Sequence, residues 1–172
     1  HIKAIMSNLS NKSREYCLFV LGINWGLRAS DLIRLKVNDV KDVELGDSFV
    51  IYEKKTNKER RLTMNEICFM AIHKLLGEKK YQDEDYLFQG QRKSHKNGKE
   101  YNRITVQYVN LMVKEWCREI NLKGRYGSHT LRKTFGYVKR VHQRVDIPTL
   151  MEIFGHSSQK ITLSYLCIQD EE

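Results

Sequence analysis

The chain has 172 residues, of which 30 are Lys or Arg and 21 are Asp or Glu, giving a formal net charge of +9. This length fits one domain with an ordinary hydrophobic core, which excludes a disulfide-stapled miniprotein and a multidomain machine. The surplus of positive charge favours a polyanionic partner. No run of apolar residues approaches the roughly 18 that a membrane span requires, so we expect a soluble protein.

The cysteines Cys17, Cys68, Cys117 and Cys167 lie far apart in the sequence. Their spacing matches neither a zinc site nor a redox motif. We therefore expect buried thiols in a reducing compartment, with disulfides as the alternative. The single proline and the lack of repeats or low-complexity segments indicate one compact unit.

The first half of the chain predicts two helices followed by a hairpin. Apolar residues from Tyr16 to Ile23 recur at helical spacing after the possible caps Asn11 and Ser13, and Gly26 ends this helix. A short second helix is predicted over 29–36. Over 43–64 the pattern changes to a β-prone run at 49–52, charged residues around a turn, and a second run at 61–63, which is typical of a β-hairpin.

The second half predicts further helices separated by basic loops. Helical spacing returns over 66–76 and ends at Gly77, and residues 89–102 form an exposed basic loop. A helix to about residue 120, a basic turn at 123–127 and a helix through 131–138 follow. Pro148 and Gly155 bracket a short helix, and a last one follows Ser157 or Ser158. The expected fold class is α+β, mostly α-helical, with one small antiparallel hairpin.

Polar residues occur in pairs that a purely structural pattern does not need. Arg28 and Asp31 are three positions apart, so the carboxylate can orient the guanidinium from one helical face. His129 and Arg132 have the same spacing, so both side chains can converge on one point. Each pair alone is also common on solvated helix surfaces.

Two further residues lie near the C-terminus. His156 stands at a turn between two predicted helices, where exposed backbone N–H groups suit an anion. Tyr165 follows in the last helix. Taken singly, a turn histidine is usually solvated and such a tyrosine is usually half-buried.

These motifs also occur in a distinctive order: Gly-Leu-Arg-x-Ser-Asp, a hairpin lysine, His-x-x-Arg, Gly-His and a tyrosine. This order resembles the catalytic domain of the tyrosine recombinases, the phage-integrase-type site-specific DNA recombinases. The resemblance runs from Tyr16 to Leu166 and implies the fold of that catalytic domain. We expect the family's N-terminal DNA-clamp domain to be absent, in keeping with a sequence that begins without Met. We therefore expect 1–172 to be a single C-terminal catalytic domain.

The resemblance assigns roles by position. Arg28 and Arg132 are similar to the paired phosphate-binding arginines, and Asp31 stands where the family often has an acidic support. Lys55 matches the hairpin lysine. Lys54 and Lys58 flank it and are the alternatives if the register is shifted.

The resemblance also implies the chemistry. Tyr165 is similar to the nucleophile, which would give a 3′-phosphotyrosyl link and a free 5′-hydroxyl. His129, similar to the family's first histidine, would accept the phenol proton, and His156, at the His/Trp position, would donate a hydrogen bond to the phosphate. Lys55 would protonate the leaving 5′-oxygen. We expect no metal and no other cofactor.

The implied partner is double-stranded DNA, bound by a homo-multimer, a tetramer on paired sites. An integrase or transposase of a mobile element is expected, cytoplasmic and nucleoid-associated, with no membrane partner. Further basic residues are predicted to contact backbone phosphates: Lys58, Arg92, Lys93, Lys96, Lys123 and Arg125.

Two alternatives remain from the sequence. A type IB topoisomerase-like enzyme would use the same chemistry to nick, swivel and reseal DNA as a monomer. A non-catalytic DNA-binding module on a recombinase-derived fold fits less well, because decay should erase at least one of the matched positions. A metal-dependent nuclease is weaker still, since no acidic cluster suits magnesium.

Overall fold

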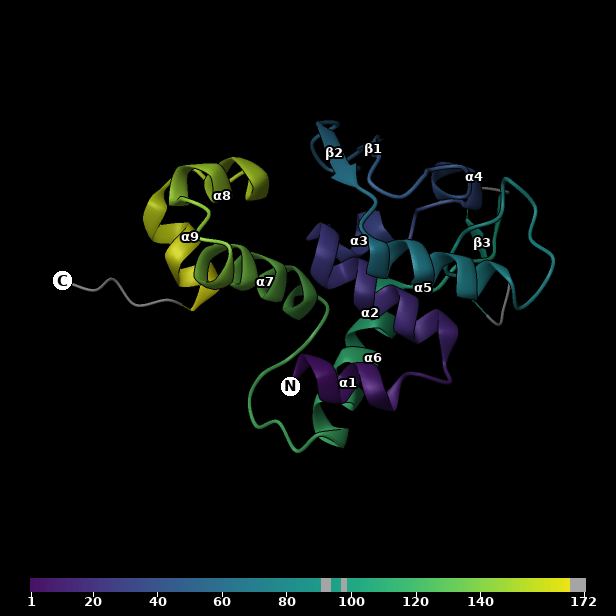
Figure 1. Ribbon diagram of the computed structural model, residues 1–172, viewed down its shortest axis with the longest axis horizontal. Coiled ribbons are helices and arrows are strands. Elements are labelled where there is room, and N and C mark those ends of the chain that lie inside the picture. The colour runs from purple at the N-terminus through teal and green to yellow at the C-terminus, as the bar shows by residue number, and fades with distance from the viewer. Residues whose placement is uncertain (91–93, 97–98, 168–172) are drawn as a thin grey trace.

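The computed structural model describes residues 1–90, 94–96 and 99–167. It is mostly helical, and no helix in these ranges is long and apolar enough to cross a membrane. Figure 1 shows the arrangement of the elements. In chain order they are α1 (Ile2–Asn8), α2 (Ser13–Trp25), α3 (Ala29–Leu32), α4 (Val37–Val40), β1 (Ser48–Tyr52), β2 (Glu59–Thr63), α5 (Glu66–Leu76), β3 (Ser94–Lys96), β4 (Lys99–Tyr101), α6 (Val106–Glu119), α7 (His129–Tyr137), the π-helical turn η1 (Val138–His142), α8 (Ile147–Phe154) and α9 (Gln159–Leu166).

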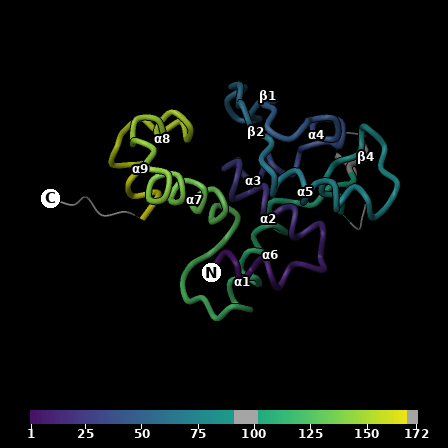
Figure 2. The backbone as a smooth tube through the Cα atoms, viewed as in Figure 1, coloured from purple at the N-terminus to yellow at the C-terminus, as the bar shows by residue number. Residues whose placement is uncertain are grey.

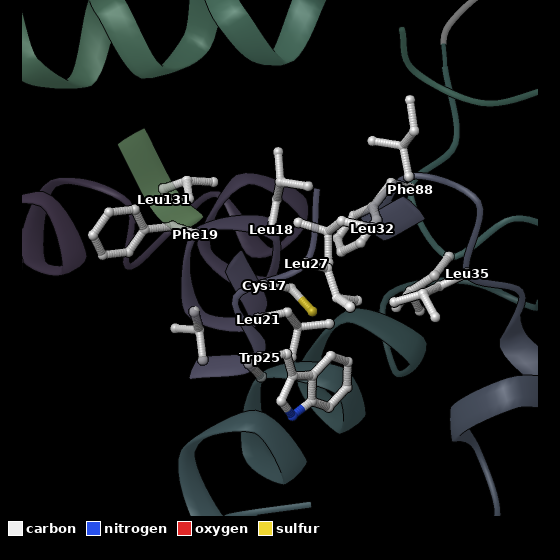
Figure 3. Packing of buried hydrophobic residues seen from close by; sticks show 14 of the residues in the cluster. Cys17, Leu18, Phe19, Leu21, Trp25, Leu27, Leu32, Leu35, Phe88 and Leu131 are labelled. Atoms are coloured by element: carbon white, nitrogen blue, oxygen red, sulfur yellow. The ribbon is translucent and has the colours of Figure 1, made fainter. Parts of the chain in front are cut away.

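Helix α2 is the centre of the larger hydrophobic cluster and packs against α5 and α7. Its residues from Cys17 to Leu21 are all buried, so the helix is enclosed around most of its circumference (Figure 3). The sequence predicted a core helix here, and the structure confirms it: Phe19 and Val20 are buried, and Tyr16 and Ile23 are half-buried and pack against the same cluster.

The first hairpin rests on the C-terminal end of α2. Strands β1 and β2 pair antiparallel from Ser48 opposite Thr63 to Tyr52 opposite Glu59. The Trp25 indole N–H donates to the Thr63 carbonyl at 3.0 Å, and the Trp25 ring meets the Phe49 ring edge-on, with centroids 5.3 Å apart. These contacts fix the position of the turn that carries Lys55.

Helix α7 joins the larger cluster to a smaller one. Leu131 belongs to the larger cluster, while Phe135 packs with Ile147, Leu150, Phe154 and Leu166 in the smaller one. Figure 2 follows the chain from α6 through a loop into α7 and then into α8 and α9, which lie together at one end of the molecule. The smaller cluster therefore holds the two C-terminal helices on α7.

Close approach of α2 and α7 requires a glycine at the end of α2. Gly26 caps α2 in the left-handed conformation, with φ 60°. A Cβ atom at this position would lie 2.3 Å from a ring carbon of Phe135. The glycine thus allows the chain to turn sharply just before Arg28 while α7 packs against the turn.

The structure also corrects two sequence predictions and adds two helices. Residues 89–102 contain a second short hairpin, β3 with β4, so the expectation of one hairpin is wrong. Charged side chains in this stretch conceal the backbone pairing from a pattern based on hydrophobicity. Cys167 is exposed, whereas Cys17, Cys68 and Cys117 are buried free thiols as expected. Helices α1 and α4 were not predicted, and α4 spans only four residues.

Candidate active site

Arg28 lies between α2 and α3, where the chain leaves the Gly26 turn. Its Nη1 donates to Oε2 of Glu53 at 2.7 Å, and the Glu53 side chain is only 6% exposed. The predicted pairing of Arg28 with Asp31 is wrong. Oδ1 of Asp31 instead accepts a hydrogen bond of 2.8 Å from the backbone N–H of Lys54. The hairpin supplies a better-placed partner to each group than they offer one another within the short helix α3.

Glu53 connects Arg28 to the hairpin turn. Its Oε2 also accepts from the Thr56 hydroxyl at 2.9 Å. Burial acts to raise the pKa of Glu53, but the hydrogen bonds from Arg28 and Thr56 outweigh it, and the pKa is lowered. The carboxylate therefore stays ionised at neutral pH. Lys55 lies in the same turn with its side chain exposed to solvent.

Arg132 projects from α7 and is 4% exposed. Its Nη1 donates to the Gly26 carbonyl at 2.5 Å and its Nη2 to the Phe154 carbonyl at 3.3 Å. Burial, reinforced by the positive charge of Arg28, lowers the pKa of Arg132 to about 10. The guanidinium thus remains charged at neutral pH, in a place where that charge is poorly screened.

Both arginines open onto one small cavity with His129. The cavity has a volume of about 150 Å³ and is lined by Arg28, Ala29, Ser30, Val106, Ser128, His129 and Arg132. Pockets for drug-sized ligands measure roughly 300–1,000 Å³, so this one suits a single small group. Two guanidiniums at its wall make an anion the fitting occupant.

Tyr165 and His156 lie against the same arginine. The Phe154 ring contacts both of their rings, with centroids 5.2 Å from Tyr165 and 5.4 Å from His156, and the Arg132 guanidinium carbon lies 4.9 Å from the Phe154 centroid. The rings of His156 and Tyr165 are also 5.2 Å apart. The ring of His156 is further held by a contact of 3.0 Å between its Nδ1 and the Thr162 hydroxyl.

The environment shifts the pKa of both groups. Burial raises the pKa of Tyr165, opposed by the charges of Arg132 and Arg28. Its hydroxyl is buried and has no hydrogen-bond partner among the described residues, while the nearby Arg132 guanidinium favours the ionised phenol. Burial and the same two arginines lower the pKa of His156, so this ring is neutral at pH 7.

The structure thus brings together most of the predicted site. Arg28, His129 and Arg132 line one cavity, and His156 and Tyr165 pack beside Arg132. The histidine whose ring contacts Tyr165 is His156 rather than His129, which is exposed at the N-terminal end of α7. Lys55 lies outside this group, on the turn that Glu53 ties to Arg28.

The predicted phosphate-contacting residues are distributed over the surface. Lys58 is exposed on the first hairpin turn. Lys123 and Arg125 line a cleft of about 720 Å³, together with Lys114 and Arg118 of α6, which the sequence did not single out. Arg92 and Lys93 fall outside the described residues, as does the side chain of Lys96, whose backbone belongs to β3.

Sequence reasoning missed two charged residues at the site, Glu53 and Arg60. Both stand among the charged residues that flank the hairpin turn, so neither departs from the pattern of a solvated loop. Arg60 donates from Nη1 to the Ile153 carbonyl at 2.7 Å and from Nη2 to the Trp25 carbonyl at 3.3 Å. The signal that could have identified Arg60 as part of the site is its register in the hairpin, which places it opposite Ile51 on the half-buried face.

No metal centre is evident in the part of the chain that the structure describes. Within it, no group of three or more His, Cys, Asp or Glu side chains could hold a metal ion.

Comparison with known proteins identifies relatives over nearly the whole chain. A Bacillus subtilis protein described as a probable integrase/recombinase, YoeC, is 36% identical over 172 residues, covering 99% of this chain and 87% of that protein. The tyrosine recombinase XerC of Caldanaerobacter subterraneus is 32% identical over 165 residues, which are 94% of this chain but 43% of that recombinase. This chain therefore spans less than half of XerC.

Solved structures share the fold. The crystal structure of XerA recombinase matches with a TM-score of 0.74 at 24% identity, covering 98% of this chain and 57% of that one. XerH site-specific recombinase bound to its difH substrate matches with a TM-score of 0.71 at 20% identity, covering 95% and 47%.

The family relationship also extends to both ends of the sequence. The model of the phage integrase family matches residues 1–172. Together with the identity to YoeC, this match shows that the chain belongs to the phage integrase family.

Proposed function

We propose that this chain is the catalytic unit of a site-specific tyrosine recombinase that cuts and rejoins double-stranded DNA through a 3′-phosphotyrosyl link. The observation that carries the proposal is the convergence of Arg28, Arg132 and Tyr165. The two guanidiniums line one small cavity, and their charges act on the buried phenol hydroxyl of Tyr165. The membership of the phage integrase family supports the same reaction.

The reaction conserves the energy of the phosphodiester bond in the phosphotyrosyl link. The phenol oxygen of Tyr165 attacks the phosphorus, a bond forms between them, and the bond from phosphorus to the 5′-oxygen breaks. Negative charge grows on the non-bridging oxygens in the transition state, where Arg28 and Arg132 can donate paired N–H groups. The free 5′-hydroxyl of another strand reverses the attack and completes rejoining.

The phenol proton has two candidate acceptors. The family resemblance favours His129, which lines the cavity beside the arginines. The ring contact favours His156, which is neutral at pH 7 and lies 5.2 Å from the Tyr165 ring, centroid to centroid. In this second assignment His129 donates to the phosphate instead. Comparing His129→Gln with His156→Gln in single-turnover cleavage separates them, because loss of the base flattens the rise of rate with pH.

The leaving 5′-oxygen needs a proton, and we assign it to Lys55. The residue is exposed on a turn whose flanks are fixed by Asp31 and by the link from Glu53 to Arg28. The side chain is therefore free to move while its base stays near the phosphate site.

A homo-multimer on paired DNA sites, acting for a mobile element, fits this chemistry, with Lys58, Lys123 and Arg125 as further phosphate contacts.

The test is to trap the covalent adduct on a suicide DNA substrate nicked near the cleavage point. Tyr165→Phe removes a hydroxyl that has no hydrogen-bond partner among the described residues, so fold and DNA binding should persist while the adduct disappears. Tyr137→Phe is the matched control, because Tyr137 is 45% exposed on α7 and should leave the adduct unchanged. An adduct peptide that maps to Tyr137, or an adduct that survives Tyr165→Phe, contradicts the proposal.

A further inference from the structure

Arg60 connects three elements that the catalytic groups depend on. It lies on β2, six positions before Glu66 starts α5, and its half-buried side chain points into the molecule. One guanidinium nitrogen donates to the carbonyl of Ile153 near the end of α8, and the other donates to the carbonyl of Trp25 at the end of α2. Its Nε is buried without a hydrogen-bond partner among the described residues.

The contacts of Arg60 parallel those of Arg132. Arg132 donates to the carbonyls of Gly26 and Phe154, each the residue after one that Arg60 contacts. The two guanidiniums thus bind neighbouring carbonyls at the same two helix ends. The C-terminal ends of helices carry unpaired carbonyls and partial negative charge, which accounts for two buried cations there.

Arg60 has no place in the chemistry described above. Burial lowers the pKa of Arg60, and the charges of Glu53 and Asp31 offset this only in part, so holding a cation in this position is unfavourable by itself. One of its hydrogen bonds joins the hairpin to the end of α8, and the other joins the hairpin to the end of α2. Helix α8 continues through Gly155 and His156 into α9. The helix that bears Tyr165 is otherwise packed in the smaller cluster, on α7 and α8.

We infer that Arg60 is a positioning residue that couples the hairpin bearing Lys55 to the helices bearing His156 and Tyr165. It holds the end of α8 at a fixed distance from β2, so that the acid Lys55 and the nucleophile Tyr165 approach the same phosphate. This inference rests on the proposed function for the roles of Lys55 and Tyr165. The physical link itself does not depend on those roles.

The first test measures the link without DNA. Native-state amide hydrogen exchange over residues 147–166 should speed up about tenfold or more in Arg60→Met, the effect of losing one charged hydrogen bond. Arg60→Lys keeps the charge but cannot reach two carbonyls, so it should fall between Arg60→Met and the parent chain. Arg61→Met is the matched control, because Arg61 neighbours Arg60 on β2 but is exposed. Unchanged exchange in Arg60→Met, or equal acceleration in Arg61→Met, overturns the inference.

The second test separates positioning from mere stabilisation. Single-turnover cleavage of a suicide substrate is measured for Lys55→Ala in the parent chain and in the Arg60→Met background. If Arg60 positions Lys55 relative to Tyr165, the loss caused by Lys55→Ala shrinks at least about threefold in that background, while DNA affinity changes little. In the Arg61→Met background the full loss should remain. Equal losses in all three backgrounds overturn the coupling.

The two tests fail separately if the proposed function is wrong. A parent chain that forms no covalent adduct refutes the recombinase chemistry, and the exchange measurement then still decides whether Arg60 links β2 to α8. Accelerated exchange with a normal Lys55 effect instead limits Arg60 to stabilising the fold and refutes its positioning role.

Discussion

Leu150 is the residue on which the stability of the C-terminal helices should depend most clearly. It is fully buried in the smaller cluster, at 0% exposure, between Phe135, Phe154 and Leu166. Leu150→Ala removes three carbon atoms from a site enclosed on all sides, and such changes destabilise cores by roughly 2–5 kcal/mol. At about 1.4 kcal/mol for each factor of ten, this raises the population of the opened state about 30-fold to several thousand-fold.

The separation of the two clusters makes the effect asymmetric. If α8 and α9 detach while the larger cluster stays folded, a change inside the larger cluster leaves their opening equilibrium untouched. Leu18, also at 0% exposure, is the matched site there. Leu18→Ala should therefore accelerate amide exchange in α2 but not in α8 and α9. Leu150→Ala should accelerate exchange in α8 and α9 and also in α2, because global unfolding exposes position 150 as well.

Native-state hydrogen exchange followed by mass spectrometry resolves the two regions, 17–21 and 147–166. The reasoning is refuted if Leu18→Ala speeds exchange in 147–166 as much as in 17–21. That result would mean that the two clusters unfold only together, as one cooperative unit. Cleavage by Leu150→Ala should also fall, because the fraction of molecules with Tyr165 in place falls with the folded fraction of α9.

Three further outcomes follow from the site. Lys55→Ala should cut ordinary DNA slowly but recover its rate on a substrate with sulfur at the bridging 5′ position, because a thiolate leaves without an acid. Arg28→Ala should not recover. Rescue of Lys54→Ala instead of Lys55→Ala would assign the acid to Lys54. Cleavage in excess EDTA should match the rate with magnesium, and a loss that magnesium restores would indicate a metal-dependent site. Burial, Arg132 and Arg28 lower the pKa of His156 in the folded state, so on acidification the unfolded chain binds a proton at this histidine before the folded chain does. The free energy of unfolding, measured in urea, should therefore fall from pH 7 to pH 5 less steeply in His156→Gln than in the parent chain. Identical slopes would contradict the assignment.

The helices and the order of the motifs could be predicted because they depend on local properties. The predicted helix of residues 66–76 matches α5, whose N-cap Asn65 accepts a hydrogen bond from the backbone of Cys68. Pro148 and Gly155 marked α8, with Gly155 in the left-handed conformation at its end. Such signals act within a few residues of one another, so the sequence alone contains them.

The pairing of charged groups could not be predicted, because it depends on contacts between distant segments. Spacing alone assigned Arg28 to Asp31, but the fold gives Arg28 to Glu53, 25 positions away, and Asp31 to the backbone of Lys54. In the same way, nothing near Arg60 in the sequence indicates that its partner is the carbonyl of Ile153, 93 positions away. A long charged side chain can reach many partners, and only the tertiary structure selects one.

The ion pair between Arg28 and Glu53 has a consequence for the entropy of DNA binding. A guanidinium carries five N–H donors. The hydrogen bond to Glu53 uses one N–H of Nη1, which leaves the remaining donors of Arg28 for the cavity that it lines. The side chain is therefore already immobilised in the free protein, before any phosphate arrives. Ordering a flexible side chain upon binding typically opposes affinity by about 0.5–1.5 kcal/mol. Because folding has already ordered Arg28, the phosphate meets a preorganised donor, and Glu53 contributes to affinity without touching the DNA.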